Sequence, residues 1–248
     1  MKIKTITFLI GFLLLLQFQT TGMEMRTGFA VEEVREDIQA QFIDNVDLTI
    51  QNQQDTLDVI SCFDINEKGW IALGHNHSTK CTIDIYSDKM DYLYSYSFNS
   101  SGSYGIEWDK DNLIIHFVRS DIALLVDSDG NCLDIKKINN TAQNNDYWNH
   151  VVFAKEKRKD DTIYKIENRY GLFNLFAMNS YSILSKTDSE HHTIDLYDVS
   201  ELQKRKIIFI GCIFLLCFLV VLFVAIRVVL SIKKTLNGTT AINVHIEP

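Results

Sequence analysis

The chain has 248 residues, of which 46% are hydrophobic, and its formal net charge is −8. Residues 1–22 carry +2 and residues 204–248 carry +5, so residues 23–203 carry −15. This acidic middle region argues against nucleic acid and anionic lipid headgroups as partners, and its length suffices for one domain with a hydrophobic core.

The N-terminus has the pattern of an export signal. A short basic start, Met1 to Lys4, precedes an apolar run of about a dozen residues, and small residues follow at Thr20 and Gly22. A helix that spans a bilayer needs about 20 apolar residues, which is more than this run supplies. We expect residues 1–22 to be a cleaved signal peptide or an uncleaved signal-anchor. Either one would place the following domain, residues 23–203, outside the cytoplasm.

A short helix is the first element predicted after this signal. Within residues 30–43, Val31, Val34, Ile38 and Phe42 recur at helical spacing with charged residues between them. We expect this helix to pack on the domain, and a partner helix is the alternative.

From Thr56 to Ile138 the hydrophobic pattern alternates with a period of two, which predicts β-strands. The intervening segments, such as "NEKG", "DKDN" and "DSDGN", contain the residues typical of tight turns. The phrase "CFDINEKGWIALG" at 62–74 has counterparts at 107–118 and 125–138. The predicted strands are 57–65, 69–73, 82–86, 92–98, 104–108, 112–118, 122–127 and 132–138.

Short strands joined by tight turns predict antiparallel meanders and a mainly β fold class. A four-stranded meander of about 40 residues is the size of one propeller blade. The segment predicts about two blades, hence a partial propeller-like sheet, since a closed propeller needs about four or more. Other elements or other subunits would have to complete the ring.

The pattern continues after residue 138. Residues 146–158 are predicted to be helical, and the segments from 161 to 199 are read as further strands. Thr193-Ile-Asp-Leu-Tyr197 repeats Thr82-Ile-Asp-Ile-Tyr86, which predicts that the blade motif starts again before the C-terminal apolar segment.

One predicted strand carries an aromatic stripe. Tyr92, Tyr94, Tyr96 and Phe98 alternate along residues 92–98, so a regular strand would present them on one face. We expect them either to pack between sheets or to form an exposed surface that stacks on carbohydrate or peptide. The exposed surface is the ligand-binding site that the sequence predicts.

Cysteine usage is sparse. Cys62, Cys81 and Cys132 precede the C-terminal apolar segment, which contains the other two cysteines. Cys62 and Cys81 could form a disulfide bond, and the alternative is that they are buried thiols. The chain has no CxxC pair.

Metal-binding and catalytic patterns are incomplete. Asp127, Asp129 and Asn131 match the start of a calcium-binding loop, but Cys132 replaces the glycine that such a loop requires. His75 and its near neighbour His77 lie in a turn without acidic ligands nearby. The sequence has neither a nucleophile elbow nor a glycine-rich phosphate loop. We therefore predict no metal, no cofactor and no catalytic residue, and a protein that is not an enzyme.

The C-terminal region predicts a membrane helix. Ile207 to Ile226 are twenty residues without a strongly polar side chain, enough to cross about 30 Å of hydrocarbon and contact membrane lipid. Three basic residues lie on each side, so the positive-inside rule does not orient the helix. The export signal decides the orientation, and it predicts that residues 227–248 form a short cytoplasmic tail.

The stretches "YSDKMDYLYSYSFNSSGSYGIEWDKDNLIIHFVRSD", "NNDYWNHVVFAKEKR" and "YKIENRYGLFNLFAMNSYSILSKTD" carry a resemblance. Residues 60–200 resemble a loosely defined group of membrane-anchored extracytoplasmic proteins of low-GC Gram-positive bacteria, whose function is unknown. The resemblance implies a location at the cell envelope and assigns no role to any residue.

Together these features predict a membrane-anchored extracytoplasmic binding or sensing module. The first alternative is a non-catalytic accessory subunit of a membrane protein complex, with another membrane protein or a further copy of the chain as its partner. An envelope hydrolase is the least favoured alternative.

Overall fold

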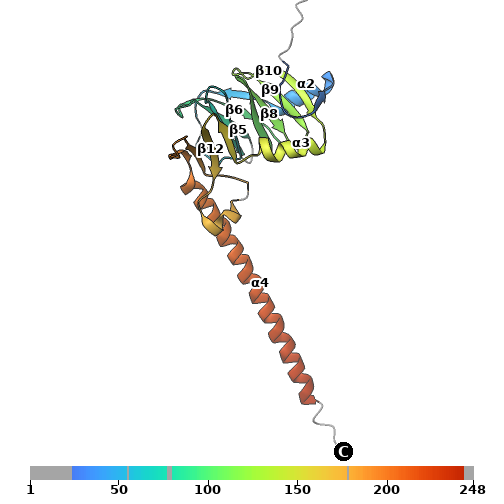
Figure 1. Ribbon diagram of the computed structural model, residues 1–248. Coiled ribbons are helices and arrows are strands. Elements are labelled where there is room, and N and C mark those ends of the chain that lie inside the picture. The colour runs from blue at the N-terminus through green and yellow to red at the C-terminus, as the bar shows by residue number, and fades with distance from the viewer. Residues whose placement is uncertain (1–23, 55, 77–79, 178, 243–248) are drawn as a thin grey trace, which may run out of the picture.

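The described part of the chain is mainly β structure followed by one long C-terminal helix (Figure 1). The computed structural model describes residues 24–54, 56–76, 80–177 and 179–242, with side chains as far as Ile232. The predicted export signal at residues 1–22 lies outside the described residues.

Fourteen strands are present in the described residues. They are β1 (Val31–Glu33), β2 (Thr49–Gln51), β3 (Cys62–Ile65), β4 (Ile71–Asn76), β5 (Cys81–Tyr86), β6 (Tyr92–Phe98), β7 (Tyr104–Asp109), β8 (Asn112–Phe117), β9 (Ile122–Val126), β10 (Cys132–Ile138), β11 (Glu156–Lys159), β12 (Thr162–Glu167), β13 (Ile183–Thr187) and β14 (Thr193–Asp198). The helical elements are α2 (Glu36–Val46), α3 (Ala142–Tyr147), the π-helical turn η1 (Trp148–Val152), the 3₁₀ turn η2 (Gly171–Phe176) and α4 (Ser200–Ile242).

The strands form three antiparallel sheets, each built on a four-stranded meander. The first sheet contains β3–β6 with β2 added beside β6, and the second contains β7–β10 with β1 added beside β10. The third sheet contains β11–β14. The eight strands predicted between residues 56 and 138 are confirmed, although the first of them begins at Cys62 rather than at residue 57.

The third meander corrects the prediction of about two repeats. The repeated sequence at Thr193–Tyr197 does not begin a new meander, because it lies in β14, the last strand of the third sheet. Its counterpart at Thr82–Tyr86 lies in β5, the third strand of the first sheet.

The first sheet lies between the other two. One of its faces packs on the second sheet through a core that includes Ile83, Tyr96 and Ile115. Its other face packs on the third sheet through a core that includes Phe63 and Leu184. Burial of apolar side chains on both faces of one sheet joins all three sheets into one packed body.

The first strands of the three meanders meet. Strand β3 contacts both β7 and β11. The Asp64 carboxylate in β3 accepts a hydrogen bond from the backbone N–H of Trp108 in β7 at 2.7 Å. Its other oxygen lies 2.9 Å from the Lys157 ammonium in β11, and both charged side chains are largely buried. One carboxylate therefore links all three sheets.

The predicted helix at residues 30–43 is only partly correct. Val31–Glu33 pair with β10 as a strand, and the helix α2 runs from Glu36 to Val46. Phe42 packs edge-on against Phe117 at 5.1 Å between ring centroids, so the helix lies on the domain as expected. Pairing at the edge of the second sheet therefore outweighs the helical spacing of Val31 and Val34.

The helix predicted at residues 146–158 is shifted and shorter. The Thr141 side chain caps the start of α3 by accepting a hydrogen bond from the Asn144 backbone N–H. A π-helical turn then ends near Phe153, whose N–H bonds to the Trp148 carbonyl. The predicted strand reading of residues 171–176 is wrong, because this segment forms the 3₁₀ turn η2.

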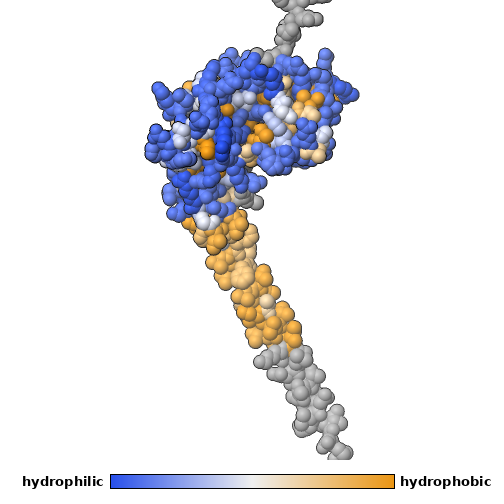
Figure 2. Space-filling view, in the orientation of Figure 1, coloured by the Kyte–Doolittle hydropathy of each residue, from blue (hydrophilic) through white to orange (hydrophobic). Residues whose placement is uncertain are grey.

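The C-terminal helix α4 is longer than predicted. By length and composition, its segment Ser200–Ile232 is long and apolar enough to cross a membrane, and Figure 2 shows most of it as an apolar rod that leaves a hydrophilic domain. The helix continues to Ile242, so most of the predicted tail is helical.

The start of α4 is fixed to the third sheet and its neighbours. The Gln203 amide, which is 2% exposed, donates hydrogen bonds to the carbonyl and the hydroxyl of Ser180. The Lys206 ammonium lies 2.8 Å from an Asp58 carboxylate oxygen. These contacts set the direction in which α4 leaves the domain.

Candidate functional site

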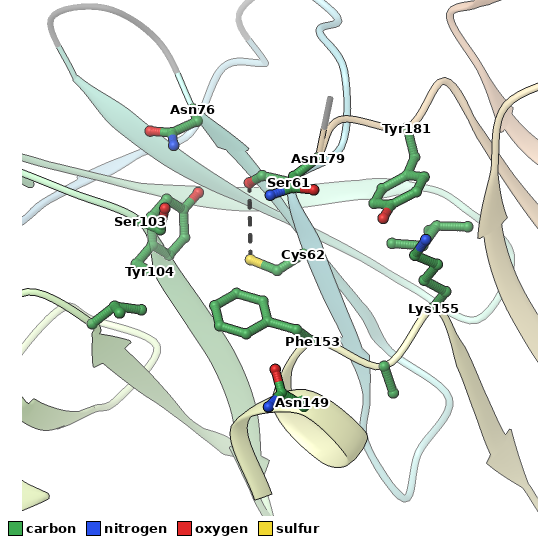
Figure 3. Close-up of a pocket in the computed structure, with 13 residues that line it drawn as sticks. Ser61, Cys62, Asn76, Ser103, Tyr104, Asn149, Phe153, Lys155, Asn179 and Tyr181 are labelled. Carbon is green, nitrogen blue, oxygen red and sulfur yellow. Dashed lines mark hydrogen bonds between the residues drawn. The ribbon is translucent and has the colours of Figure 1, made fainter. Parts of the chain in front are cut away.

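A pocket of about 430 Å³ opens where the three sheets meet (Figure 3). We call it the convergence pocket. The first sheet contributes residues from β3 and β4, the second from β7, and the third from β12, and the segment from η1 to β11 closes one side. It is lined by Ser61, Cys62, Asn76, Ser103, Tyr104, Val118, Asn149, Phe153, Ala154, Lys155, Ile166, Asn179 and Tyr181.

The lining of the convergence pocket combines polar and apolar groups and is almost uncharged. Asn76, Asn149 and Asn179 contribute amides, and serine hydroxyls lie between them, while Lys155 is the one charged side chain among the lining residues. Amides and hydroxyls can each donate and accept hydrogen bonds. Such a lining suits a ligand that carries hydroxyl or amide groups and no strong charge.

Two aromatic side chains give the pocket apolar walls. Figure 3 shows Phe153 beneath Cys62, and Tyr181 beside Lys155 on the opposite side. The Lys155 ammonium lies 5.4 Å from the centre of the Tyr181 ring. Phe153 stacks on Trp148 with 5.5 Å between ring centroids and 18° between the ring planes. A ligand that touches Phe153 therefore lies one ring away from a tryptophan.

The inner wall contains two groups that could ionise only at high pH. Burial raises the pKa of the Cys62 thiol to about 12, so at neutral pH the sulfur is protonated and a poor nucleophile. Burial also raises the pKa of Tyr104 well above its usual range. The Tyr104 hydroxyl lies 2.8 Å from the Thr82 carbonyl and 3.0 Å from the His75 carbonyl, so it serves the structure of the first sheet.

The structure does not contain the Cys62–Cys81 disulfide that the sequence left open. Both cysteines are buried free thiols. Strand β4 lies between their strands, and neighbouring strands are about 4.8 Å apart. Their Cα atoms are therefore at least about 10 Å apart, because two strand spacings separate them and Cys81 is also offset by two residues along its strand. A disulfide can bridge roughly 7 Å at most.

The predicted aromatic ligand surface is not exposed. Tyr96 and Phe98 are completely buried between the first and second sheets, and Tyr94 packs at the edge of the same core. A β-bulge beside Tyr86 displaces Tyr92 from this face and packs it against the third sheet instead. The stripe is therefore core packing, which was the alternative expectation.

The incomplete metal patterns have structural roles. The Asp127 carboxylate accepts hydrogen bonds from the backbone N–H groups of Asp129 and Asn131, as expected for a hairpin turn. His75 is buried, with Nδ1 3.0 Å from the Val59 carbonyl, and His77 lies outside the described residues. Among the described residues, no group of three or more His, Cys, Asp or Glu side chains is placed to hold a metal ion.

A second polar cluster lies on the outer face of the second sheet. The Glu107 carboxylate accepts hydrogen bonds from Tyr147 at 2.5 Å and Thr27 at 2.9 Å, and His116 Nε2 lies 3.0 Å away. Burial acts to raise the pKa of Glu107, but the interaction with His116 and the hydrogen bonds from Tyr147 and Thr27 outweigh it and lower the pKa. A carboxylate held ionised by three partners ties the N-terminal segment and α3 to the sheet and is a poor proton donor.

No protein-family model, curated protein or solved structure matches the chain. The resemblance to membrane-anchored bacterial proteins therefore stays a prediction.

Sequence reasoning missed the convergence pocket because its residues are scattered from Ser61 to Tyr181 in ordinary turns and strand ends. The only sequence signal is the series of asparagines and serines that follow the strands, and such residues are also typical of turns.

Proposed function

We propose that the chain is a membrane-anchored binding or sensing module, with its β domain on the extracytoplasmic side and a small neutral polar ligand in the convergence pocket. The observation that carries the proposal is the set of amides and hydroxyls that the first two sheets, the η1 segment and the loop before β13 bring to one place. The expected export signal and the apolar helix α4 support the location.

The arrangement of the sheets supports a partial propeller of three blades. Each sheet is built on a four-stranded meander, and the first strands β3, β7 and β11 lie next to one another. In propellers the blades surround a central channel. The convergence pocket would be the counterpart of that channel, on a ring that three blades leave open.

A sensing role is supported by the short path from the pocket to the helix. Tyr181 lines the pocket, and the neighbouring Ser180 accepts the hydrogen bonds of Gln203 in α4. A ligand that moves Tyr181 would therefore act one residue away from the contact that fixes α4. A shift at that contact would move α4 and thereby its predicted cytoplasmic end.

The chemistry of the pocket supports binding rather than catalysis. The lining has no carboxylate and no histidine, and the Cys62 thiol stays protonated at neutral pH. A hydrolase would need a general base or an activated nucleophile within reach of its substrate. We therefore propose no reaction and no cofactor.

The proposal is tested with the full chain in mild detergent, screened against neutral oligosaccharides and short uncharged peptides by tryptophan fluorescence. Trp148 reports on the pocket through Phe153. With a ligand that binds, Asn149→Leu removes a lining amide and should weaken affinity about tenfold, the equivalent of one lost hydrogen bond.

Asn145→Leu is the matched control, because Asn145 is exposed one helical turn earlier and does not line the pocket. It should leave the affinity unchanged. Equal binding by both variants, or no response to any neutral polar compound, would contradict the proposal.

The alternative of an accessory subunit, partnered by another membrane protein or a second copy, stays a prediction. Sizing of the complex extracted gently from its own membrane tests it, because a second protein at fixed stoichiometry would favour that role.

A further inference from the structure

The turn η2 exposes an apolar surface that the folded domain does not use. Its four large apolar side chains are Leu172, Phe173, Leu175 and Phe176, and their exposed fractions are 86%, 62%, 83% and 38%. Single exposed apolar residues are ordinary on protein surfaces, but four within five positions form a patch that indicates an interaction site. We call these four residues the η2 patch.

The turn that presents the η2 patch is held in place. Gly171 has a φ of +58°, which starts the turn in a backbone conformation that glycine adopts readily. The Asn174 side chain accepts a hydrogen bond from the Tyr170 backbone N–H and donates one to the Asn168 carbonyl. The Tyr170 hydroxyl donates to the Ser200 carbonyl at the start of α4. The apolar side chains are therefore displayed by an ordered turn.

The η2 patch lies beside the apolar part of α4. The ring of Phe176 is 6.2 Å from the ring of Phe214, centroid to centroid. Phe214 is seven residues beyond Ile207, where the apolar run begins, and a helix rises 1.5 Å per residue. Phe176 therefore meets the helix about 12 Å past Lys206, the last of the basic residues 204–206. Figure 1 shows η2 below the β domain and against α4.

This position fixes the depth of the patch in a membrane. The basic residues 204–206 suit the headgroup region, and a point about 12 Å beyond them lies among the acyl chains. The bonds of Gln203 to Ser180 and of Lys206 to Asp58 hold α4 against the domain. If α4 enters a bilayer, η2 must enter the same leaflet with it.

The groove between η2 and α4 has the polarity profile of a leaflet. A cavity of about 950 Å³ there is bounded near the domain by Arg169, Glu201 and Lys204, and farther along α4 by Phe176 and Leu215. Charged groups thus line the end nearest the domain and apolar groups line the deeper end. This order matches lipid headgroups and acyl chains.

We propose that the η2 patch is a second membrane contact, inserted into the acyl region of the leaflet on the side of the β domain. Two contacts, α4 and η2, then hold the domain at one fixed tilt over the bilayer. The inference needs α4 to lie in the membrane but does not depend on the ligand proposed for the convergence pocket.

The test is fluorescence quenching of the full chain in lipid nanodiscs that hold one chain each. Phe173→Trp places a tryptophan in the η2 patch, and phosphatidylcholine brominated on its acyl chains quenches tryptophans that contact those chains. The unsubstituted chain supplies the background from Trp70, Trp108 and Trp148, which all lie in the β domain.

Two further variants serve as controls. Phe214→Trp reports whether α4 is in the bilayer. Ile194→Trp is the matched exposed control, because Ile194 is 56% exposed in the third sheet and lies six residues before Ser200. At about 3.3 Å per strand residue it is about 20 Å from the start of the helix.

We expect the tryptophans at 173 and 214 to lose most of their added fluorescence in brominated lipid, and the tryptophan at 194 to lose none. Quenching at 214 without quenching at 173 would overturn the proposal and leave a protein partner or a second copy as the occupant of the patch. Quenching at neither position would overturn it together with the membrane location of α4. Equal quenching at 194 would overturn it by showing lipid contact over the whole domain.

Discussion

Asp64 gives the sharpest prediction about how the three sheets are held together. Its carboxylate binds Lys157 of β11 at 2.9 Å and the Trp108 N–H of β7 at 2.7 Å. The substitution Asp64→Asn keeps an oxygen for Trp108 but removes the negative charge. The Lys157 ammonium, whose side chain is 13% exposed, then lies between packed sheets without a counter-charge.

The magnitude follows from this burial. Removing one partner of a fully buried ion pair costs about 3–5 kcal/mol, and partial access to water reduces this to about 2–3 kcal/mol here. For a domain of this size each kcal/mol lowers the melting temperature by roughly 2–4 °C, so the expected fall is about 5–10 °C. The second substitution Lys157→Met removes the stranded charge and should recover more than half of the loss.

The assay is thermal unfolding of the full chain in detergent, with Asp111→Asn as the matched control. Asp111 pairs with Lys68 at 2.7 Å, but both side chains are more than half exposed, so this pair is worth about 0–1 kcal/mol. Equal destabilisation by Asp64→Asn and Asp111→Asn, or no recovery with Lys157→Met, would refute the role of Asp64 as the link between the sheets.

Two other predictions concern the wall of the convergence pocket. Gly74→Ala places a methyl group 2.5 Å from the Cys62 sulfur, so the substituted chain should unfold at a lower urea concentration. The added substitution Cys62→Ala removes the clash and should recover part of this loss. A Gly74→Ala chain of unchanged stability would contradict the close packing. Burial raises the pKa of Cys62 from 9.0 to about 12, so the folded state holds its proton more tightly than the unfolded state. The stability that this thiol contributes is therefore complete below pH 9 and is lost as the pH rises towards 12. Over that range the urea midpoint of Cys62→Ala should fall less steeply with pH than the midpoint of the unsubstituted chain. Identical slopes for the two chains would show that Cys62 does not contribute.

Much of the first two sheets could be predicted because their strands alternate cleanly and their turns contain Asp, Asn and Gly. The third sheet was harder to predict, since β11 has the sequence "EKRK" and owes its place to pairing with β12. The apolar run "GLFNLF" had the composition of a strand. Yet Gly171 and Asn174 make it a 3₁₀ turn through local backbone bonds that periodicity does not report.

The candidate site could not be predicted for a related reason. A single bulge beside Tyr86 moved Tyr92 to another face, and packing of the second sheet buried Tyr96 and Phe98. The pocket arises instead from the way three sheets converge, which brings Asn149 near Ser61 across 88 positions of sequence. Local patterns do not encode such a long-range arrangement.

The most direct test of the central claim, that the convergence pocket binds a small neutral polar molecule, is a comparative equilibrium dialysis. The full chain and its Asn149→Leu and Asn145→Leu variants are dialysed against the small-molecule fraction of the medium that surrounds the producing cells, and the retained compounds are identified by mass spectrometry. We predict a neutral compound, rich in hydroxyl or amide groups, that the unsubstituted chain and Asn145→Leu retain and Asn149→Leu does not. Retention of the same compounds by all three chains, or of charged compounds alone, would contradict the account.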